Sequence, residues 1–503
     1  MYDDNTGTGG APRTVVIGAG MGGLSAAMHL QARGHAVTVF DAHTWPGGKM
    51  RTVASDAGPI DAGPTVLTMR DVFDDMFAAT GTKLDDHVSL IQEDLLARHF
   101  WPDGTRLDLT SDHAMNAETI LRFSGKRAAS DYLAFSKEAA DLFALFSAPM
   151  MRRAEPQITE LARAALRKPR HLGVLSPMAK LRRHLNKRFS DPRLSQLFGR
   201  YATYIGGSPL AAPALLLLIW QAEVAGVWRV DGGMHTLASA IADRFRVMGG
   251  VLRLGEPVAE VKAGGNEVSG VVLCSGQTVT AETVVYAGDP RALALGMLGK
   301  SISHIAPQTL TSPRSLSARV WSFAANLNAD TPLAHHNVFF GASPTAEFED
   351  LAGGAIPADP TLYVCAEDRG QNRTTPEGAE RFEIILNAAP LTEAQRPPDE
   401  EKICHQTTFQ TLDRFGLSFS PSPNAANLST PSTFEALFPG SAGSIYGQSP
   451  HGMMAALKRP RARTKIRGLY LAGGGTHPGA GVPMAALSGQ HAAEAILKDH
   501  VLT

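Results

Sequence analysis

The sequence has few of the residues that metal-binding and disulfide-stabilised proteins use. Its 503 residues include three cysteines, Cys274, Cys365 and Cys404, which lie far apart and show no metal-ligand spacing. No zinc-type spacing and no nucleophile elbow is visible either, which argues against metallohydrolases and serine hydrolases. We therefore expect a reduced, cytosol-facing protein without a metal.

Long apolar runs and a charge excess are also absent. The longest apolar run, Leu210 to Trp220, contains Pro213 and is about half as long as a membrane-spanning helix. The 47 basic and 48 acidic residues leave a net charge of -1, so the overall charge of the chain does not favour binding to nucleic acid. The first residues lack the basic and apolar regions of a signal peptide, and residues 1–11 are expected to be a disordered lead-in.

A glycine-rich turn near the N-terminus is the strongest positive signal. An apolar strand leads into Gly18, Gly20 and Gly23, which supply the tight turn, the close backbone approach and the helix packing that a dinucleotide pyrophosphate needs. The anion then lies at a helix N-terminus. Asp41 ends a second β-branched strand, at the distance where a carboxylate accepts hydrogen bonds from ribose hydroxyls. The pattern predicts an α/β dinucleotide-binding domain.

Two further turns favour FAD over a nicotinamide cofactor. A nicotinamide dehydrogenase usually needs a polarising acid, base or metal, and no motif supplies one, whereas a flavin carries its own hydride acceptor. The turn at residues 47–51 and the glycine-rich turn at 473–481, which enters a helix near Pro483, suit an extended FAD. The N-terminus of that last helix would favour the reduced, anionic flavin.

The order of predicted elements indicates at least two interleaved domains, as the chain length also requires. Residues 112–229 show mostly helical patterns, β-rich runs resume at Val251, and a strand, turn and helix end the chain. We predict a cofactor domain built from three segments and a substrate domain of mixed sheet and helices built from two. The boundaries are 12–95, 230–300 and 455–503 for the first, and 96–229 and 301–454 for the second.

Taken together, the motifs resemble the FAD-dependent carotenoid desaturases, relatives of phytoene desaturase within the amine-oxidase-like flavoproteins. The specific Thr476-His477-Pro478-Gly479-Ala480-Gly481 signature contributes, and matching segments cover nearly the whole chain: residues 18–23, 47–49, 61–65, 204–209, 212–214, 231–234, 445–447 and 472–481. Within the family, residues 48–51, 65–70 and 225–235 are most similar to the 1-hydroxycarotenoid 3,4-desaturases of purple phototrophic bacteria, also called hydroxyneurosporene or methoxyneurosporene desaturases.

The resemblance implies a Rossmann-type FAD-binding domain and a function. It implies formation of a C–C double bond in a hydroxylated acyclic carotenoid, in spheroidene or spirilloxanthin biosynthesis, by hydride transfer to FAD and loss of a neighbouring proton. The polyene spreads the positive charge, so tunnel geometry selects the reacting carbons and no catalytic residue is assigned. The implied cofactor-binding residues are Gly18, Ala19, Gly20, Met21, Gly22, Gly23, Asp41, Gly48, Lys49, Arg51, Gly63, Pro64, Thr65, Val258, Gly473, Gly474, Gly475 and Met484.

Two positions depart from the wider family pattern. Asp41 replaces a common glutamate, and its shorter side chain should still reach the ribose. Gly475 lies near the position of an acid that related amine oxidases direct toward the ribityl chain, so a backbone N–H or water would have to serve. Two enzymatic alternatives are a phytoene-type desaturase and a carotene isomerase. An alternative of another class is a non-catalytic prenyl-lipid carrier.

Several residues allow both a structural and a functional interpretation. Asp61 orders its own loop or meets the cofactor, and Gly232 with Gly233 starts a helix or touches the flavin. His477 is structural or a proton acceptor. Trp228, Arg229 and the apolar run Leu215–Trp220 belong to packing or to a substrate channel.

One basic segment suggests a membrane partner. Glu155 and Glu160 are the only acids among eleven basic residues: Arg152, Arg153, Arg163, Arg167, Lys168, Arg170, Lys180, Arg182, Arg183, Lys187 and Arg188. Within it, Ile158, Leu161, Ala162, Ala165 and Leu166 share one helical face. We expect either a solvated helix or peripheral association with an anionic inner (chromatophore) membrane, apolar face down, with carotenoid entering from the bilayer.

Overall fold

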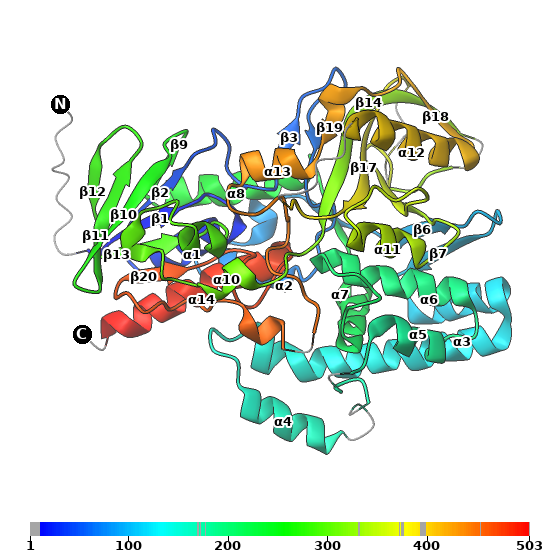
Figure 1. Ribbon diagram of the computed structural model, residues 1–503, viewed down its shortest axis with the longest axis horizontal. Helices are drawn as coiled ribbons and strands as arrows, with labels where there is room; N and C mark the ends of the chain where they lie inside the picture. Colours follow the sequence, from blue (N-terminus) through cyan, green and yellow to red (C-terminus); the bar gives the residue numbers. More distant parts are fainter. Residues whose placement is uncertain are drawn as a thin grey trace.

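The computed structural model describes residues 11–168, 171, 173–176, 178–329, 332–371, 373, 377–392, 399–452 and 454–501, without the side chains of residues 158, 161, 164, 165 and 167. The predicted lead-in lies outside the described residues apart from residue 11. Figure 1 shows a sheet near the N-terminus, a second sheet beside it and a helical layer below the second sheet.

The first sheet is parallel and gathers strands from both ends of the chain. Its order is β20 (Leu469–Leu471), β13 (Thr283–Tyr286), β1 (Arg13–Ile17), β2 (Ala36–Asp41) and β9 (Val251–Leu254). Because both faces are covered, its strands consist of nearly continuous apolar runs. A smaller antiparallel sheet of β10 (Val258–Gly264), β11 (Glu267–Leu273) and β12 (Thr278–Thr280) follows β9.

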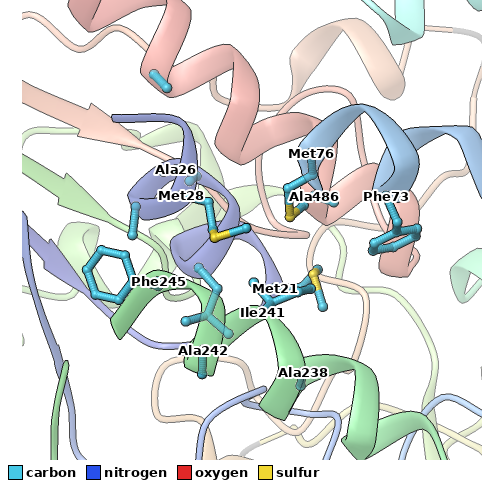
Figure 2. Packing of buried hydrophobic residues seen from close by; sticks show 14 of the residues in the cluster. Met21, Ala26, Met28, Phe73, Met76, Ala238, Ile241, Ala242, Phe245 and Ala486 are labelled. Atoms are coloured by element: carbon cyan, nitrogen blue, oxygen red, sulfur yellow. The ribbon is translucent and has the colours of Figure 1, made fainter. Parts of the chain in front are cut away.

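Helices from four parts of the sequence form the core on one side of this sheet. They are α1 (Met21–Gln31), α2 (Asp71–Ala78), α8 (Met234–Val247) and α14 (Val482–Val501). Figure 2 shows Met21 and Met28 of α1 between Ile241 of α8 and Met76 of α2. Small residues allow α1 and α14 to lie close together, because a Cβ on Gly489 would lie 2.2 Å from the carbonyl oxygen of Gly22. This packing brings the first turns of the chain next to the last.

The second sheet is mainly antiparallel and carries the rest of the chain. Its order is β18 (Leu417–Ser420), β14 (Ser317–Ala329), β17 (Glu380–Ala388), β16 (Leu362–Ala366), β15 (His336–Phe339), β6 (Leu95–Phe100) and β7 (Arg106–Thr110), with β19 (Leu428–Ser429) beside β14. Two short ribbons connect the layers: β3 (Thr52–Val53) with β4 (Ile60–Asp61), and β5 (Leu90–Gln92) with β8 (Trp228–Val230). The expected mixed sheet is therefore present.

The predicted helical stretch is also present and contributes the lower layer of Figure 1. It contains α3 (His113–Phe146), η2 (Ser147–Met151), α4 (Ile158–Arg167), α5 (Leu181–Arg188), α6 (Pro192–Gly199), η4 (Arg200–Ile205), η5 (Ala214–Leu218) and α7 (Ile219–Val224). In Figure 1, α4 lies at the outer edge of the molecule, below α3. None of the helices in the described part of the chain has the length and apolar character needed to cross a bilayer.

Shorter helices lie in the connections of both sheets. They are α9 (Pro290–Ala294), α10 (Gln308–Thr311), α11 (Ala346–Ala352), α12 (Glu400–Arg414) and α13 (Pro431–Leu437), with short 3-10 turns at Leu84–Asp86, Lys300–Ile302, Ala425–Asn427 and Ala456–Lys458. Of these helices, α9 packs against the first sheet. Ile302 and Ile305 pack with the first sheet although they follow the predicted boundary at residue 300. The exact domain limits stay a prediction.

Candidate functional site

The first glycine turn leaves an open space at the start of α1. A Cβ on Gly23 would lie 1.9 Å from the carbonyl oxygen of Gly18, and one on Gly22 would lie 2.5 Å from the amide nitrogen of Gly473. A Cβ on Gly20, in contrast, would meet no atom within 4 Å. Gly20 is also the N-cap of α1, and no side chain caps this helix. A bound anion would satisfy the amide groups of its first turn, so the geometry fits a pyrophosphate.

Asp41 holds this turn from the end of β2. Its carboxylate accepts hydrogen bonds from the amide of Ala19 at 2.6 Å and from the amide of His43 at 2.7 Å. The backbone oxygen of Asp41 accepts from Glu256, which places the turn before Val258 against the same strand end. Each carboxylate oxygen can accept a second bond, so the ribose contact stays a prediction alongside the observed contacts within the protein.

The C-terminal turn lies beside the first one. Gly473 donates to the hydroxyl of Ser488 at 2.7 Å, and the carbonyl oxygen of Gly474 accepts from Arg459 at 2.7 Å. A Cβ on Gly475 would lie 2.5 Å from Pro290, which explains in packing terms why this position carries no acid. Met484 belongs to the first turn of α14 and faces a large cavity.

That cavity has a volume of about 620 Å³ and collects several predicted site residues. Gly63, Pro64, Thr65 and Met484 line it, together with residues of the Thr476–Gly481 signature. Its wall is mostly apolar, and α3, η2, η5 and α7 contribute large apolar side chains to it: Phe143, Phe146, Met150, Met151, Leu215, Leu216, Leu218 and Ile219. The run Leu215–Trp220 thus belongs both to the cavity wall and to the core, because Leu215, Leu216, Leu218 and Ile219 line the cavity whereas Trp220 is fully buried in the core.

The turn after Asp41 supplies two cationic side chains beside this region. Lys49 donates from Nζ to the carbonyl oxygen of Ile445 at 2.7 Å, and burial lowers its pKa to about 8. Arg51 donates to the hydroxyl of Ser429 at 2.7 Å, while its Nε has no hydrogen-bond partner among the described residues. A Cβ on Gly63 would lie 2.0 Å from the carbonyl oxygen of Lys49, so the two predicted segments are in contact.

Three of the residues that allowed both a structural and a functional interpretation, Asp61, Gly233 and Arg229, have contacts within the protein. The carboxylate of Asp61 accepts from the amides of Met234 and His235 at 2.5 and 3.2 Å, so it caps α8 rather than its own loop. A Cβ on Gly233 would lie 2.6 Å from that carboxylate, so this glycine serves the helix start. Arg229 forms a buried ion pair with Glu93 at 2.7 Å.

His477 also has a protein partner, since its Nε2 lies 2.9 Å from the carbonyl oxygen of Arg153. Desolvation on burial lowers its pKa, which disfavours the imidazolium form. Both observations support the structural interpretation of this histidine.

Sequence reasoning missed a cluster of buried acids next to the predicted turn. Desolvation raises the pKa of Glu367 to about 8 and raises that of Glu383 well above its usual value. A hydrogen bond from the backbone of Gly63 lowers the pKa of Glu383, but this effect is smaller than that of desolvation. Glu383 lies on the same face of β17 as the cavity residues Ile385 and Asn387. No spacing in the sequence marks this cluster, because Glu367 follows β16 whereas Glu383 lies on β17.

A second cluster that sequence reasoning missed lies at η4, and only part of it reaches the cavity wall. Tyr201 and Tyr204 donate hydrogen bonds to the carboxylate of Glu223, the first at 2.6 Å. Arg200 donates to the hydroxyl of Tyr204 at 3.3 Å, and both line the cavity. Tyr204 begins one of the segments that carried the family resemblance, which was the available signal, although its hydrogen bonds were not predictable.

One group of side chains has metal-ligand character. The ligand atoms of His335, His336 and Cys365 lie within 4.8 Å of one another and are buried. Desolvation raises the pKa of the Cys365 thiol well above its usual value, which opposes the thiolate that a metal requires. The expectation of a metal-free protein stays a prediction.

Comparisons with known proteins identify the relatives. The family described as flavin containing amine oxidoreductase matches residues 21–497. A protein named hydroxyneurosporene desaturase from Cereibacter sphaeroides is 52% identical over 97% of this chain and 98% of its own length. A protein of the same name from Rhodobacter capsulatus is 46% identical over the same shares. Cyclohexylamine oxidase from Brevibacterium oxydans shares the fold with a TM-score of 0.58, at 16% identity over 98% of this chain and 100% of that chain.

Proposed function

This chain belongs to the flavin containing amine oxidoreductase family, and from that premise we propose that it introduces a C–C double bond into a hydroxylated acyclic carotenoid. It is an FAD-dependent oxidoreductase. The observation that carries the substrate class is the large, mostly apolar cavity whose wall includes the first turn of α14. A cavity of this composition favours a long hydrocarbon over an amine or another small polar molecule.

FAD would bind across the two adjoining glycine turns. The open space at Gly20 would take the pyrophosphate and Asp41 the ribose, while residues 473–475, Gly63 and Met484 would surround the ring system. Bound FAD supplies the hydride acceptor. The protein excludes water through its apolar wall and orients the polyene, and the conjugated chain itself spreads the developing charge.

Pigment chromatography on purified protein tests this function. The FAD-loaded chain should convert a 1-hydroxylated acyclic carotene into a product with one more conjugated double bond, and its yellow colour should bleach with dithionite. A protein that binds carotenoid but carries no flavin would be a carrier. Conversion of non-hydroxylated carotenes alone would instead indicate the phytoene-type activity.

We further propose that the α4 region rests on an anionic membrane surface. Leu166 and Met178 are 70% and 80% exposed, and Arg163 and Arg183 of the same segment are also exposed. Ala162 of α4 also lines the cavity, so the same helix meets both the surface and the substrate space. Among the described residues of this segment, four basic side chains form ion pairs within the protein: Arg152, Arg153, Lys168 and Arg188.

Vesicle sedimentation separates this proposal from a solvated helix. Replacing Arg163, Arg183 and Lys187 with Gln removes three exposed charges, each worth about 1 kcal/mol at an anionic surface, so binding should weaken by about 100-fold. A matched control replaces three exposed basic residues away from α4, Arg33, Lys262 and Lys300. Equal pelleting of both variants with phosphatidylglycerol vesicles would refute the proposal.

A further inference from the structure

The cavity wall changes character between its helical part and its sheet part. Side chains from α3, η2 and α4 are apolar there, whereas η4, β16 and β17 contribute Arg200, Tyr204, Tyr363 and Asn387. In Figure 1, α4 and β17 lie in different regions of the molecule, with α3 and α7 between them. The cavity therefore has an apolar region near α4 and a polar region near the second sheet.

Most polar groups of this region are already engaged. The Tyr363 hydroxyl lies 2.7 Å from the hydroxyl of Thr65 and 2.6 Å from Nδ1 of His336. Asn387 donates to Glu347 at 2.8 Å. These side chains hold one another in place, so they have fewer hydrogen bonds left for a bound molecule.

Arg200 differs from these side chains because it has more N–H donors than hydrogen-bond acceptors to receive them. A guanidinium has five N–H donors, and among the described residues Arg200 makes one hydrogen bond, from Nη2 to Tyr204. Its Nε is buried without a partner. Its guanidinium carbon lies 5.2 Å from the Tyr204 ring centroid, and the tyrosine in turn donates to Glu223. The cation is thus held at the cavity wall with unused donors.

We propose that Arg200, held by Tyr204 and Glu223, donates a hydrogen bond to the substrate oxygen and so selects oxygenated carotenes and fixes which end of the chain reacts. This inference rests on the proposed function. Arginine has no acceptor, and both a tertiary hydroxyl and a methyl ether offer an acceptor oxygen. The Arg200 guanidinium can therefore donate to a hydroxylated and to a methoxylated carotene, whereas a hydrocarbon end offers it no acceptor.

The position of η4 suits this role. In a 1-hydroxycarotenoid 3,4-desaturation, the oxygen lies within about 4 Å of the nearer reacting carbon, because only one C–O and two C–C bonds of about 1.5 Å each separate them. The oxygen-binding group must therefore lie close to the cofactor. A Cβ on Gly206, just after η4, would lie 2.6 Å from the Tyr446 ring, and Arg459 donates to the carbonyl oxygens of both Tyr446 and Gly474. These contacts connect η4 to the C-terminal glycine turn.

The test compares three substrates with one polyene length: a 1-hydroxycarotene, its 1-methoxy ether and the hydrocarbon. Wild-type protein should convert both oxygenated substrates with a kcat/KM about 10- to 100-fold above that of the hydrocarbon, as expected for one hydrogen bond to a charged group. Arg200→Met should reduce this preference to within about threefold. Carotenoid retained by the FAD-loaded protein after vesicles are removed, measured by pigment extraction, should show the same loss.

Two further variants keep the result interpretable. Arg200→Met combined with Glu223→Gln avoids an uncompensated buried carboxylate, and it serves if the single variant loses FAD. Tyr201→Phe is the matched control, because Tyr201 also donates to Glu223 but is 1% exposed and lies outside the cavity wall. It should retain the preference.

The outcomes separate this inference from the proposed function. An FAD-loaded Arg200→Met protein, or the double variant in its place, that keeps the wild-type preference would overturn the inference alone. Wild-type protein that converted the oxygenated carotenes and the hydrocarbon with equal kcat/KM would also overturn the inference alone. Absence of turnover on every carotene would refute the proposed function and the inference together.

Discussion

Gly20→Val should separate cofactor binding from folding. Gly20 has a φ of -71° and a ψ of 174°, a conformation that any residue adopts, and its Cβ would meet no protein atom within 4 Å. The cost to the unbound protein is then the weaker N-cap of α1, about 1 kcal/mol. The valine side chain would nevertheless fill the space that a pyrophosphate needs.

The expected loss of FAD affinity is much larger than this loss of stability. Two hydrogen bonds from amides to a charged phosphate contribute about 1.5–3 kcal/mol each, so their loss corresponds to a weakening of at least about 100-fold. Fluorescence titration of the apoprotein with FAD measures the loss of FAD affinity. Denaturant unfolding of the apoprotein measures the loss of stability.

Gly22→Ala provides the opposite control. Its Cβ would lie 2.5 Å from the amide nitrogen of Gly473, so the variant should lose about 1–3 kcal/mol of unfolding free energy through overpacking between the two turns. If Gly20→Val bound FAD with wild-type affinity, the pyrophosphate would not lie at this turn. If the Gly20→Val apoprotein lost several kcal/mol of unfolding free energy relative to the wild-type apoprotein, protein atoms would not leave room for a side chain at Gly20.

Three other expected outcomes concern Asp41, Lys49 and Cys365. Asp41→Ala removes the acceptor of two amide hydrogen bonds and should weaken FAD binding about 10- to 100-fold in titration, with Asp41→Asn intermediate; an unchanged Kd for the alanine variant would contradict this. Burial lowers the pKa of Lys49 from 10.5 to about 8, so between these values the unfolded chain binds more protons and the free energy of unfolding should rise with pH. The burial penalty is fully present below pH 8. Lys49→Met should lack that rise, and equal pH slopes in the two proteins would refute the assignment. Burial raises the pKa of the Cys365 thiol beside His335 and His336, which disfavours metal binding, so chelation should leave activity unchanged. Stoichiometric metal in the purified protein would contradict this.

Local patterns were sufficient to predict the elements around the cofactor turns. The first strand, turn and helix fall at Arg13–Ile17 and Met21–Gln31, as predicted, and the last strand and helix join the same sheet and core. The reason is that glycine turns and apolar periodicity depend on neighbouring residues alone. The pairing of β6 with β15, in contrast, joins residues more than 200 positions apart, and no local pattern specifies it.

The polar part of the site was invisible in the sequence for a related reason. Arg200 and Glu223 are ordinary surface residue types, and only the tertiary structure removes them from water and places them together. Asp61 was misjudged in detail because its partners, the amides at the start of α8, lie about 170 residues away. Burial and long-range partners decide the roles of these residues.

The division of the cavity into two regions also predicts the orientation of an asymmetric substrate. A hydroxyl placed against Phe143, Phe146 or Met150 would lose its hydrogen bonds to water without replacement, which costs about 1–3 kcal/mol in proteins. The same hydroxyl beside Arg200 keeps a hydrogen bond, so the two orientations should differ in population by about 5- to 150-fold. The hydrocarbon end then extends toward α4, and the oxygenated end lies at the cofactor turns. A carotene without oxygen has no such preference, so its two ends should compete for the cofactor.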